Sequence, residues 1–222
     1  MSILDAVIRT GRIPSTNARR EDKKRYSEVM SKHLAEEVAD GLRSAGFVGT
    51  KPDRDGPGEK AFQGGLGPKK VDVSYSDDRH GLMLAISIKT ICFPEYGKNL
   101  KNRFSDMCAE AITLHMRFPY SVIGGMFAFP VGAANDTSKA RKVSTFDRAT
   151  KLFSTVSGRD QHGNALEKFE SFAMLQFQPV DESGVDPWIS LVDCVSNRKM
   201  SEDEYFDDLK SRFLIRNPHI DL

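Results

Sequence analysis

The sequence predicts a single α/β domain in which helices flank a mixed central β-sheet. Segments with a helical repeat alternate with segments that have the period, or the continuous apolar run, of a strand. Their order is helix, strands, helix, strand, helix, strands, helix, within 222 residues. A chain of this length can bury one sizeable core. Because it shows no internal repeat or low-complexity segment, we expect residues 1–222 to form one domain.

The first helix is predicted from Glu21 to Ala45. Apolar residues recur there at four-residue intervals, and Gly46 ends the pattern: Tyr26, Met30, Leu34, Val38 and Leu42. Residues 1–17 show no comparable repeat, so we expect a loose and flexible arm.

Two strands around a polar turn are predicted within Lys69 to Thr90, KKVDVSYSDDRHGLMLAISIKT. The turn is Ser76 to Gly81, which favours an antiparallel hairpin. Because side chains alternate along a strand, Asp72 points to the face opposite that of Val71 and Val73. The same rule predicts two faces for the second strand: Leu82, Leu84, Ile86 and Ile88 on one, and Met83, Ala85, Ser87 and Lys89 on the other. Asp72 then lies opposite Ala85 or Ser87, depending on the register. Either register brings the aspartate, serine and lysine together, because cross-strand neighbours lie about 5 to 8 Å apart.

The remaining elements follow from the same patterns. A helix is predicted from Asn99 to Phe118, closed by Pro119, followed by a fully buried strand from Tyr120 to Val131. The later predictions are helices at Ser138–Ser157 and Ser201–Leu214, strands at Ser171–Val180 and Trp188–Val195, and loose segments at Thr50–Gly67 and Gly158–Asn164. The acidic start of the last helix, SEDEYFDD, is interpreted as favourable to the helix dipole rather than as a cation site.

An aspartate on one strand and an acidic-x-lysine tripeptide on the next resembles the PD-(D/E)xK nucleases, the restriction-endonuclease-like superfamily. Asp72 matches the aspartate and Lys89 the lysine, while Ser87 stands at the second acidic position and Val71 replaces the proline. The literal Pro52-Asp53 lies in a loop rich in glycine and proline, KPDRDGPGE, and is a poor substitute.

The resemblance implies a Mg²⁺-dependent endonuclease, in which Mn²⁺ can substitute. Asp72 and the backbone carbonyl of Ile88 would bind the ion, and Lys89 would orient or activate water. Such ions take oxygen ligands and keep several waters. Ser87 is a weaker ligand than a carboxylate, so another acid is needed. Glu37 is the candidate, because it projects into the inward-facing arc of the first helix. The alternative for Glu37 is a position at the edge of this arc, from which its carboxylate reaches water or forms an ion pair with a lysine or arginine.

Basic and polar segments near the hairpin are candidates for contact with double-stranded DNA. They are the basic front of the first helix (Asn17–Tyr26), the segment after the hairpin (Lys98, Lys101, Asn102, Arg103) and the glycine-rich segment before it (Gln63, Lys69, Lys70). Solvent-exposed charged faces give the same pattern. A net charge of +1 neither requires nor excludes nucleic acid, since nucleases bind phosphate through local patches.

Composition sets the remaining expectations. No apolar run reaches the length of a membrane span, and the start lacks a signal-peptide pattern. The sequence therefore predicts a cytoplasmic protein that does not associate with a membrane. Three cysteines without metal-type spacing predict reduced thiols. The predicted function is a DNA endonuclease of restriction or phage-defence type, acting as a homodimer or with a partner subunit if it cuts both strands. Because of Ser87, a catalytically inactive DNA-binding or assembly subunit stays open as the alternative, as does a structural α/β domain.

Overall fold

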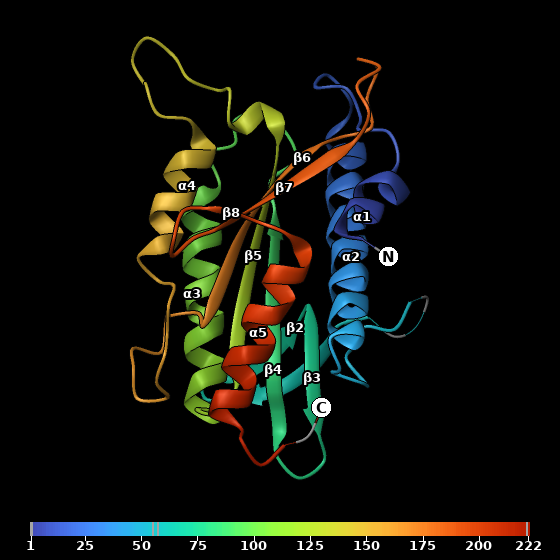
Figure 1. Ribbon diagram of the computed structural model, residues 1–222. Coiled ribbons are helices and arrows are strands. Elements are labelled where there is room, and N and C mark those ends of the chain that lie inside the picture. The colour runs from blue at the N-terminus through green and yellow to red at the C-terminus, as the bar shows by residue number, and fades with distance from the viewer. Residues whose placement is uncertain (1, 55, 57, 221) are drawn as a thin grey trace.

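The computed structural model describes residues 2–54, 56, 58–220 and 222 and is an α/β structure built on a mixed six-stranded sheet (Figure 1). The strand order is β3-β4-β5-β6-β7-β8. Strands β4, β5 and β6 run parallel, whereas β3, β7 and β8 pair antiparallel with their neighbours. The strands span Val73–Asp77 (β3), Gly81–Thr90 (β4), Val122–Pro130 (β5), Ser171–Gln178 (β6), Trp188–Asp193 (β7) and Lys199–Met200 (β8). The predicted mixed sheet with flanking helices is confirmed.

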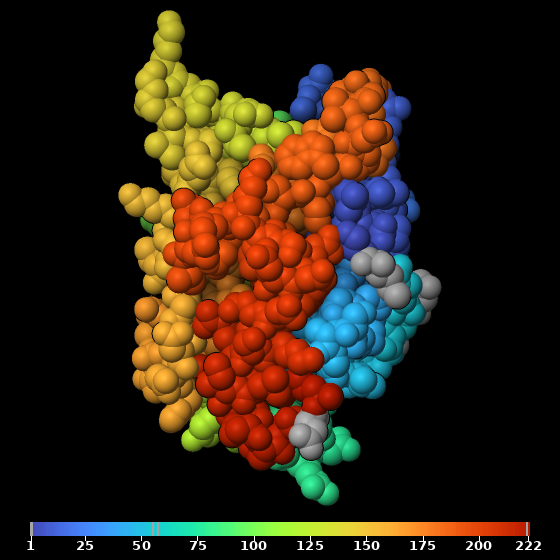
Figure 2. Space-filling view, in the orientation of Figure 1, coloured from blue at the N-terminus to red at the C-terminus, as the bar shows by residue number. Residues whose placement is uncertain are grey.

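Helices cover both faces of the sheet and make two separate cores. One core contains α1 (Ile3–Thr10), α2 (Arg20–Ser44) and α5 (Glu202–Arg216), and the other contains α3 (Leu100–Arg117) and α4 (Thr145–Ser154). In Figure 2 the C-terminal segments, orange and red, cover one face of the molecule. Strand β5 is buried along its whole length, because its residues alternate between the two cores. This is the predicted continuous apolar strand.

The expected loose arm contains a packed helix. Helix α1 begins with a capping box between Ser2 and Asp5, and its residues Ile3, Ala6 and Val7 are buried in the core with α2. The prediction of a flexible arm over residues 1–17 was therefore wrong for this part. Eight residues are too few to show a clear helical repeat in the sequence, and packing stabilises the helix instead.

A small antiparallel hairpin precedes the large sheet. Strands β1 (Lys60–Gly64) and β2 (Gly67–Val71) pair only with each other and lie against α3, where the Gly65 N–H donates to the carbonyl of Thr113 at 2.8 Å. The predicted loose segment Thr50–Gly67 thus includes a strand. The predicted first strand is divided at Asp72, since Val71 ends β2 and Val73 begins β3.

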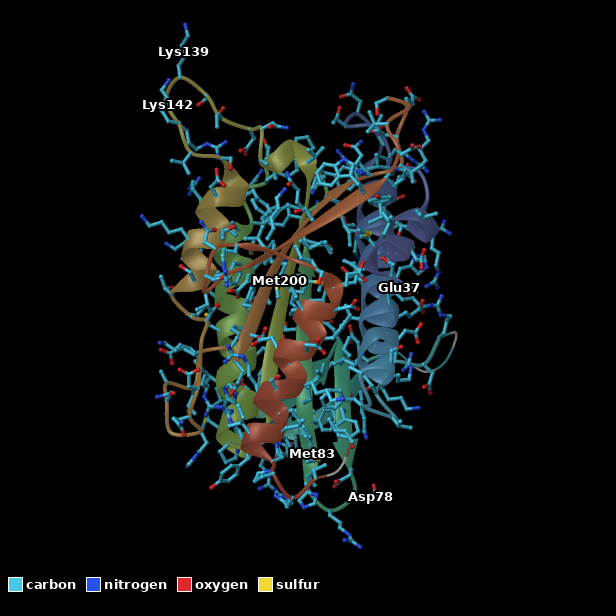
Figure 3. The ribbon with its side chains drawn as sticks, viewed as in Figure 1. Glu37, Asp78, Met83, Lys139, Lys142 and Met200 are labelled. Atoms are coloured by element: carbon cyan, nitrogen blue, oxygen red, sulfur yellow. The ribbon has the colours of Figure 1, made fainter. Side chains whose placement is uncertain are left out.

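Two further predictions, the faces of a strand and the start of a helix, needed correction. The register of β3 and β4 shifts at a bulge between Tyr75 and Ser76. As a result Leu82 packs in the core with α3 and Met83 in the core with α2, the reverse of what simple alternation predicts. The predicted helix Ser138–Ser157 begins only at Thr145, because the Ser144 side chain accepts from the Asp147 N–H as an N-cap. The residues before it form a projecting loop on which Figure 3 labels Lys139 and Lys142.

Candidate active site

The bend between β2 and β3 places Asp72 beside the end of β4. Val73 pairs with Ile86, so Asp72 reaches the level of Ser87, which is the second of the two predicted registers. The Ile88 N–H donates to Asp72 Oδ2 at 2.6 Å. A backbone donor on a buried strand is rigid, and this hydrogen bond fixes the carboxylate against β4.

Lys89 lies between two carboxylates. Its Nζ is 3.1 Å from Asp72 Oδ2 and 3.7 Å from Glu110 Oε2. The lysine side chain is 20% exposed and that of Asp72 is 18% exposed, so a solvent-borne ligand can reach the pair. The predicted convergence of Asp72 and Lys89 is present in the structure.

Glu110 is the acidic residue that the sequence interpretation missed. It projects from α3, its side chain is 3% exposed, and Lys69 Nζ lies 3.6 Å from its Oε2. A signal for it does exist in the sequence. Glu110 comes three residues after Met107 and four before Leu114, so it lies on the apolar face of its helix.

Ser87 on β4 and Glu110 on α3 face one another between the sheet and the helix. Among the described residues, neither the buried Ser87 Oγ nor Glu110 Oε1 has a hydrogen-bond partner of ordinary geometry. Buried polar atoms without partners are uncommon in folded proteins and call for an explanation. Oxygen atoms of this kind are what a divalent cation and its water shell bind.

Burial and neighbouring charges shift the pKa values of Glu110 and Lys89. Burial raises the pKa of Glu110, the lysines Lys89 and Lys69 oppose this, and the nearby charge of Asp72 adds to it, with a net increase. Burial lowers the pKa of Lys89, but Asp72 and Glu110 together raise it by more. Lys89 therefore stays a cation at neutral pH.

Glu37 lies on α2, where Figure 3 labels it, and its carboxylate is bound by arginines. Oε1 of Glu37 accepts from Arg9 at 2.6 Å and from Arg54 at 2.9 Å. The prediction that Glu37 faces inward holds, because its side chain is fully buried. The structure does not bring it to Asp72, and the sequence's alternative, an ion pair with arginine, describes its environment.

A groove of about 1240 Å³ opens over Asp72 and Lys89 between α2 and the start of α3. Its wall includes basic residues from both helix starts: Arg20, Lys23, Lys24, Lys98 and Arg103. Glu36, the residue before Glu37 in α2, lines this groove, whereas Glu37 does not. Arg9 binds Glu36 at 2.6 Å.

The other predicted contact residues divide into two groups. Lys98 and Arg103 line the groove, whereas Lys101 and Asn102 are exposed and do not. On the β1–β2 hairpin, Lys69 reaches Glu110, Lys70 Nζ lies 3.9 Å from Glu59, and Gln63 donates to its neighbour's carbonyl at 3.4 Å. The literal Pro52-Asp53 borders the groove, but Asp53 forms an ion pair with Lys51.

Several findings bear on metal, thiol and membrane expectations. Within the described part of the chain, no group of three or more His, Cys, Asp or Glu side chains is arranged to hold a metal ion. The three cysteines are free thiols, as predicted. In the same residues, no helix has the length and apolarity required to cross a membrane.

Comparison with protein-family models, with curated proteins and with solved structures found no significant match to this chain.

Proposed function

We propose that this protein is a divalent-metal-dependent DNA endonuclease of the restriction-endonuclease-like type, acting in restriction or phage defence. The observation that carries the proposal is the cluster of Asp72, Lys89 and Glu110, in which Asp72 and Lys89 line an open groove and Glu110 is buried beside Lys89. Glu110 supplies from α3 the second carboxylate that Ser87 cannot supply from β4. The proposed site therefore has two acids and a lysine, with the second acid on a different element from the expected one.

The donor atoms fit a hard cation such as Mg²⁺ or Mn²⁺. Asp72, Glu110 and the Ile88 carbonyl would hold it, and Ser87 Oγ and Glu110 Oε1 are buried oxygens whose hydrogen-bonding capacity is unused among the described residues. When bound, the ion would polarise the phosphate and acidify a water molecule. Mg²⁺ needs only one or two carboxylates because it keeps several waters.

Each side chain has a role that its contacts support. Asp72 is held by the Ile88 N–H, so its carboxylate needs no reorganisation to bind a ligand. Lys89 is cationic, which suits it to stabilise negative charge that develops on the phosphate and to orient a water molecule, rather than to remove a proton. The basic residues at the groove wall would attract the DNA backbone.

The absence of a three-residue metal cluster in the described residues favours one alternative, a DNA-binding or assembly subunit that does not cut. Metal-dependent nicking separates the two. Purified protein is incubated with supercoiled plasmid in Mg²⁺, in Mn²⁺ and in EDTA, and band shifts on the same plasmid report binding. The proposal expects nicking in either metal and none in EDTA.

Substitutions then assign the residues. Asp72→Asn, Lys89→Met and Glu110→Gln are each expected to lower the nicking rate by about 100-fold or more, in the range seen when one electrostatic group of a site is removed. Asp53→Asn is the matched control, because Asp53 borders the same groove and belongs to the literal Pro-Asp pair. Nicking that survives all three substitutions contradicts the proposed site, and DNA binding without nicking in any metal supports the subunit. Cutting of both strands that rises with protein concentration would indicate a dimer.

A further inference from the structure

A second pocket lies at the carboxyl ends of the three parallel strands, the end shown at the top of Figure 1. Its volume is about 660 Å³. Phe93 and Tyr96 follow β4, Pro130 ends β5 and Gln178 ends β6, and all four line it. Ligands of open α/β sheets bind at this end of the strands, because the connections there diverge and leave a crevice.

The pocket wall combines apolar and aromatic residues with polar ones, and it includes the charged residues Arg12, Asp181 and Glu182, of which Arg12 and Glu182 form an ion pair. Tyr96 is 9% exposed, and burial raises the pKa of its phenol, so the ring stays neutral. The amide of Gln178 and the hydroxyl of Ser183 contribute polar atoms to the same wall. A pocket wall that combines aromatic rings with hydrogen-bonding groups suits a heterocycle, and the pocket volume lies within the range of small-molecule sites.

The pocket adjoins the groove over the candidate active site. Cys92, Phe93 and Pro94 line both. Phe93 comes four residues after Lys89, a path of about 14 Å at most for an extended chain. Next to these shared residues the backbone is strained, because Glu95 has a φ of 69°, a conformation uncommon for a residue with a side chain. Lys23 Nζ lies 5.9 Å from the centre of the Phe93 ring, so a cation lies beside this shared wall.

We propose that this pocket takes one unstacked nucleobase of the DNA strand whose phosphodiester lies at Asp72 and Lys89. The inference rests on the proposed function, and it names the substrate class: DNA that carries a locally unpaired base beside the cleaved bond. Extruding a base costs a few kcal/mol in paired DNA and least where the base is already mismatched. Stacking on aromatic side chains and hydrogen bonds to the exposed base edge offset that cost.

The test fills the pocket from its exposed rim. Val185 lines the pocket and is 51% exposed, so Val185→Trp blocks it without disturbing the core. Ser183→Trp is a second blocking variant on the same rim. Val195→Trp is the matched control, since Val195 is 54% exposed and lies outside the pocket. Equal melting temperatures by circular dichroism verify that the three variants fold.

Binding is measured in EDTA and in Ca²⁺ on two duplexes of about 25 base pairs, one fully paired and one with a single central mismatch. The wild type and Val195→Trp are expected to bind the mismatched duplex at least fivefold more tightly, as base–aromatic stacking contributes about 1 to 3 kcal/mol. Val185→Trp and Ser183→Trp are expected to lose that preference. In Mg²⁺, the wild type is expected to cut within about two nucleotides of the mismatch.

The outcomes distinguish this inference from the proposed function. A protein that nicks both duplexes equally and whose blocked variants behave as wild type is a nuclease without a base pocket, which overturns the inference alone. Mismatch preference that the blocked variants lose, without cutting in any metal, supports the pocket and contradicts the nuclease proposal. Failure to bind either duplex overturns both.

Discussion

Glu110 is the residue whose environment decides the electrostatics of the candidate site. It is buried, and two lysines, Lys69 and Lys89, approach the same oxygen at 3.6 and 3.7 Å. These distances exceed those of a hydrogen bond, so burial outweighs the attraction and the pKa of Glu110 is raised. Glu37 is equally buried but is bound by Arg9 at 2.6 Å. Arginine pairs of this kind leave a carboxylate little capacity for another ligand, whereas Glu110 retains an unpartnered Oε1 among the described residues.

The raised pKa of Glu110 makes a prediction about stability and pH. A carboxyl whose folded pKa exceeds its unfolded value binds more protons in the folded state, so its contribution to stability is full at low pH and is lost as pH rises through the folded pKa. Glu110→Gln removes this titration. Without metal, the variant is expected to have a higher free energy of unfolding than wild type at pH 7.5, with the difference shrinking at pH 4.

Urea unfolding of both proteins at the two pH values measures this difference, and Glu28→Gln, an exposed glutamate on α2, is the control. A Glu110→Gln variant that is less stable than wild type at pH 7.5 would show that the lysine contacts dominate burial. The same shift affects activity, because the carboxylate form is needed to bind a cation. Nicking is therefore expected to decline with acidification at a pH above 4.5, the ordinary value for this side chain.

At the scale of elements, helix α1 shows what the sequence could not reveal. It is short, and its contacts are long-range: Ser2 and Ile3 hydrogen-bond to Glu202 on α5, and Arg9 pairs with Glu36 and Glu37 on α2. Ile3→Ala is expected to lower the free energy of unfolding by about 2 to 4 kcal/mol, because Ile3 is completely buried. Ile8→Ala on the same helix is the control, since Ile8 is 50% exposed, and about 0.5 kcal/mol or less is expected. Equal effects in urea unfolding would mean that α1 is not packed in solution.

A buried ion cluster joins three further elements at the end of the sheet opposite the pocket. Glu170 accepts from Arg159 at 2.6 Å and from the Ile123 N–H at 2.8 Å, and it also pairs with His115 and Arg216. Burial would raise the pKa of Glu170, but the His115 hydrogen bond and the arginine charge lower it by more. The carboxylate form is thus retained in the folded protein, and the cluster is intact at neutral pH.

Glu170→Gln leaves the buried Arg159 without its counter-charge, so a loss of about 3 to 5 kcal/mol in the free energy of unfolding is expected at pH 7. Urea unfolding measures it, with Glu28→Gln again as the exposed control, for which a change of about 0.5 kcal/mol or less is expected. A change below about 1 kcal/mol for Glu170→Gln would show that the cluster contributes little net stability.

These elements also show which parts of the structure are readable from sequence. The amphipathic helices α2 and α3, the buried strand β5 and the β3–β4 hairpin follow from periodicity, because each carries its own hydrophobic pattern. Asp72 and Lys89 were found because alternation places them on one face. The partners of Glu37 were not readable, since Arg9 and Arg54 come from segments in which the sequence shows no clear repeat. The phase shift in β4 depends on a bulge, and no residue type specifies a bulge uniquely.

At the scale of the whole molecule, the groove is built by segments that are far apart in the chain. The front of α2 and the front of α3 form its basic wall, and the hairpin with Asp72 and Lys89 forms its base. The projecting loop with Lys139 and Lys142 extends beyond the body of the protein, in Figure 3 at the same end as the carboxyl ends of the parallel strands. Basic residues gather beside the site even though the whole chain carries a net charge of only +1. Local charge of this kind binds phosphates and makes affinity depend on salt.

The salt dependence of DNA affinity can show which basic residues of the groove contact phosphates. Arg20 on α2, Arg103 on α3 and Lys98 in the turn before α3 all line it. Each Arg→Gln or Lys→Gln substitution at these positions is expected to weaken DNA binding and to reduce the slope of log affinity against log salt by about 0.9, as one phosphate contact is lost. Lys151→Gln is the control, because this exposed lysine of α4 lies outside the groove. Slopes measured by fluorescence anisotropy between about 50 and 200 mM salt, in EDTA to prevent cutting, test this directly. If Lys151→Gln changes the slope as much as the groove variants do, DNA binds through a diffuse positive surface and not through this groove.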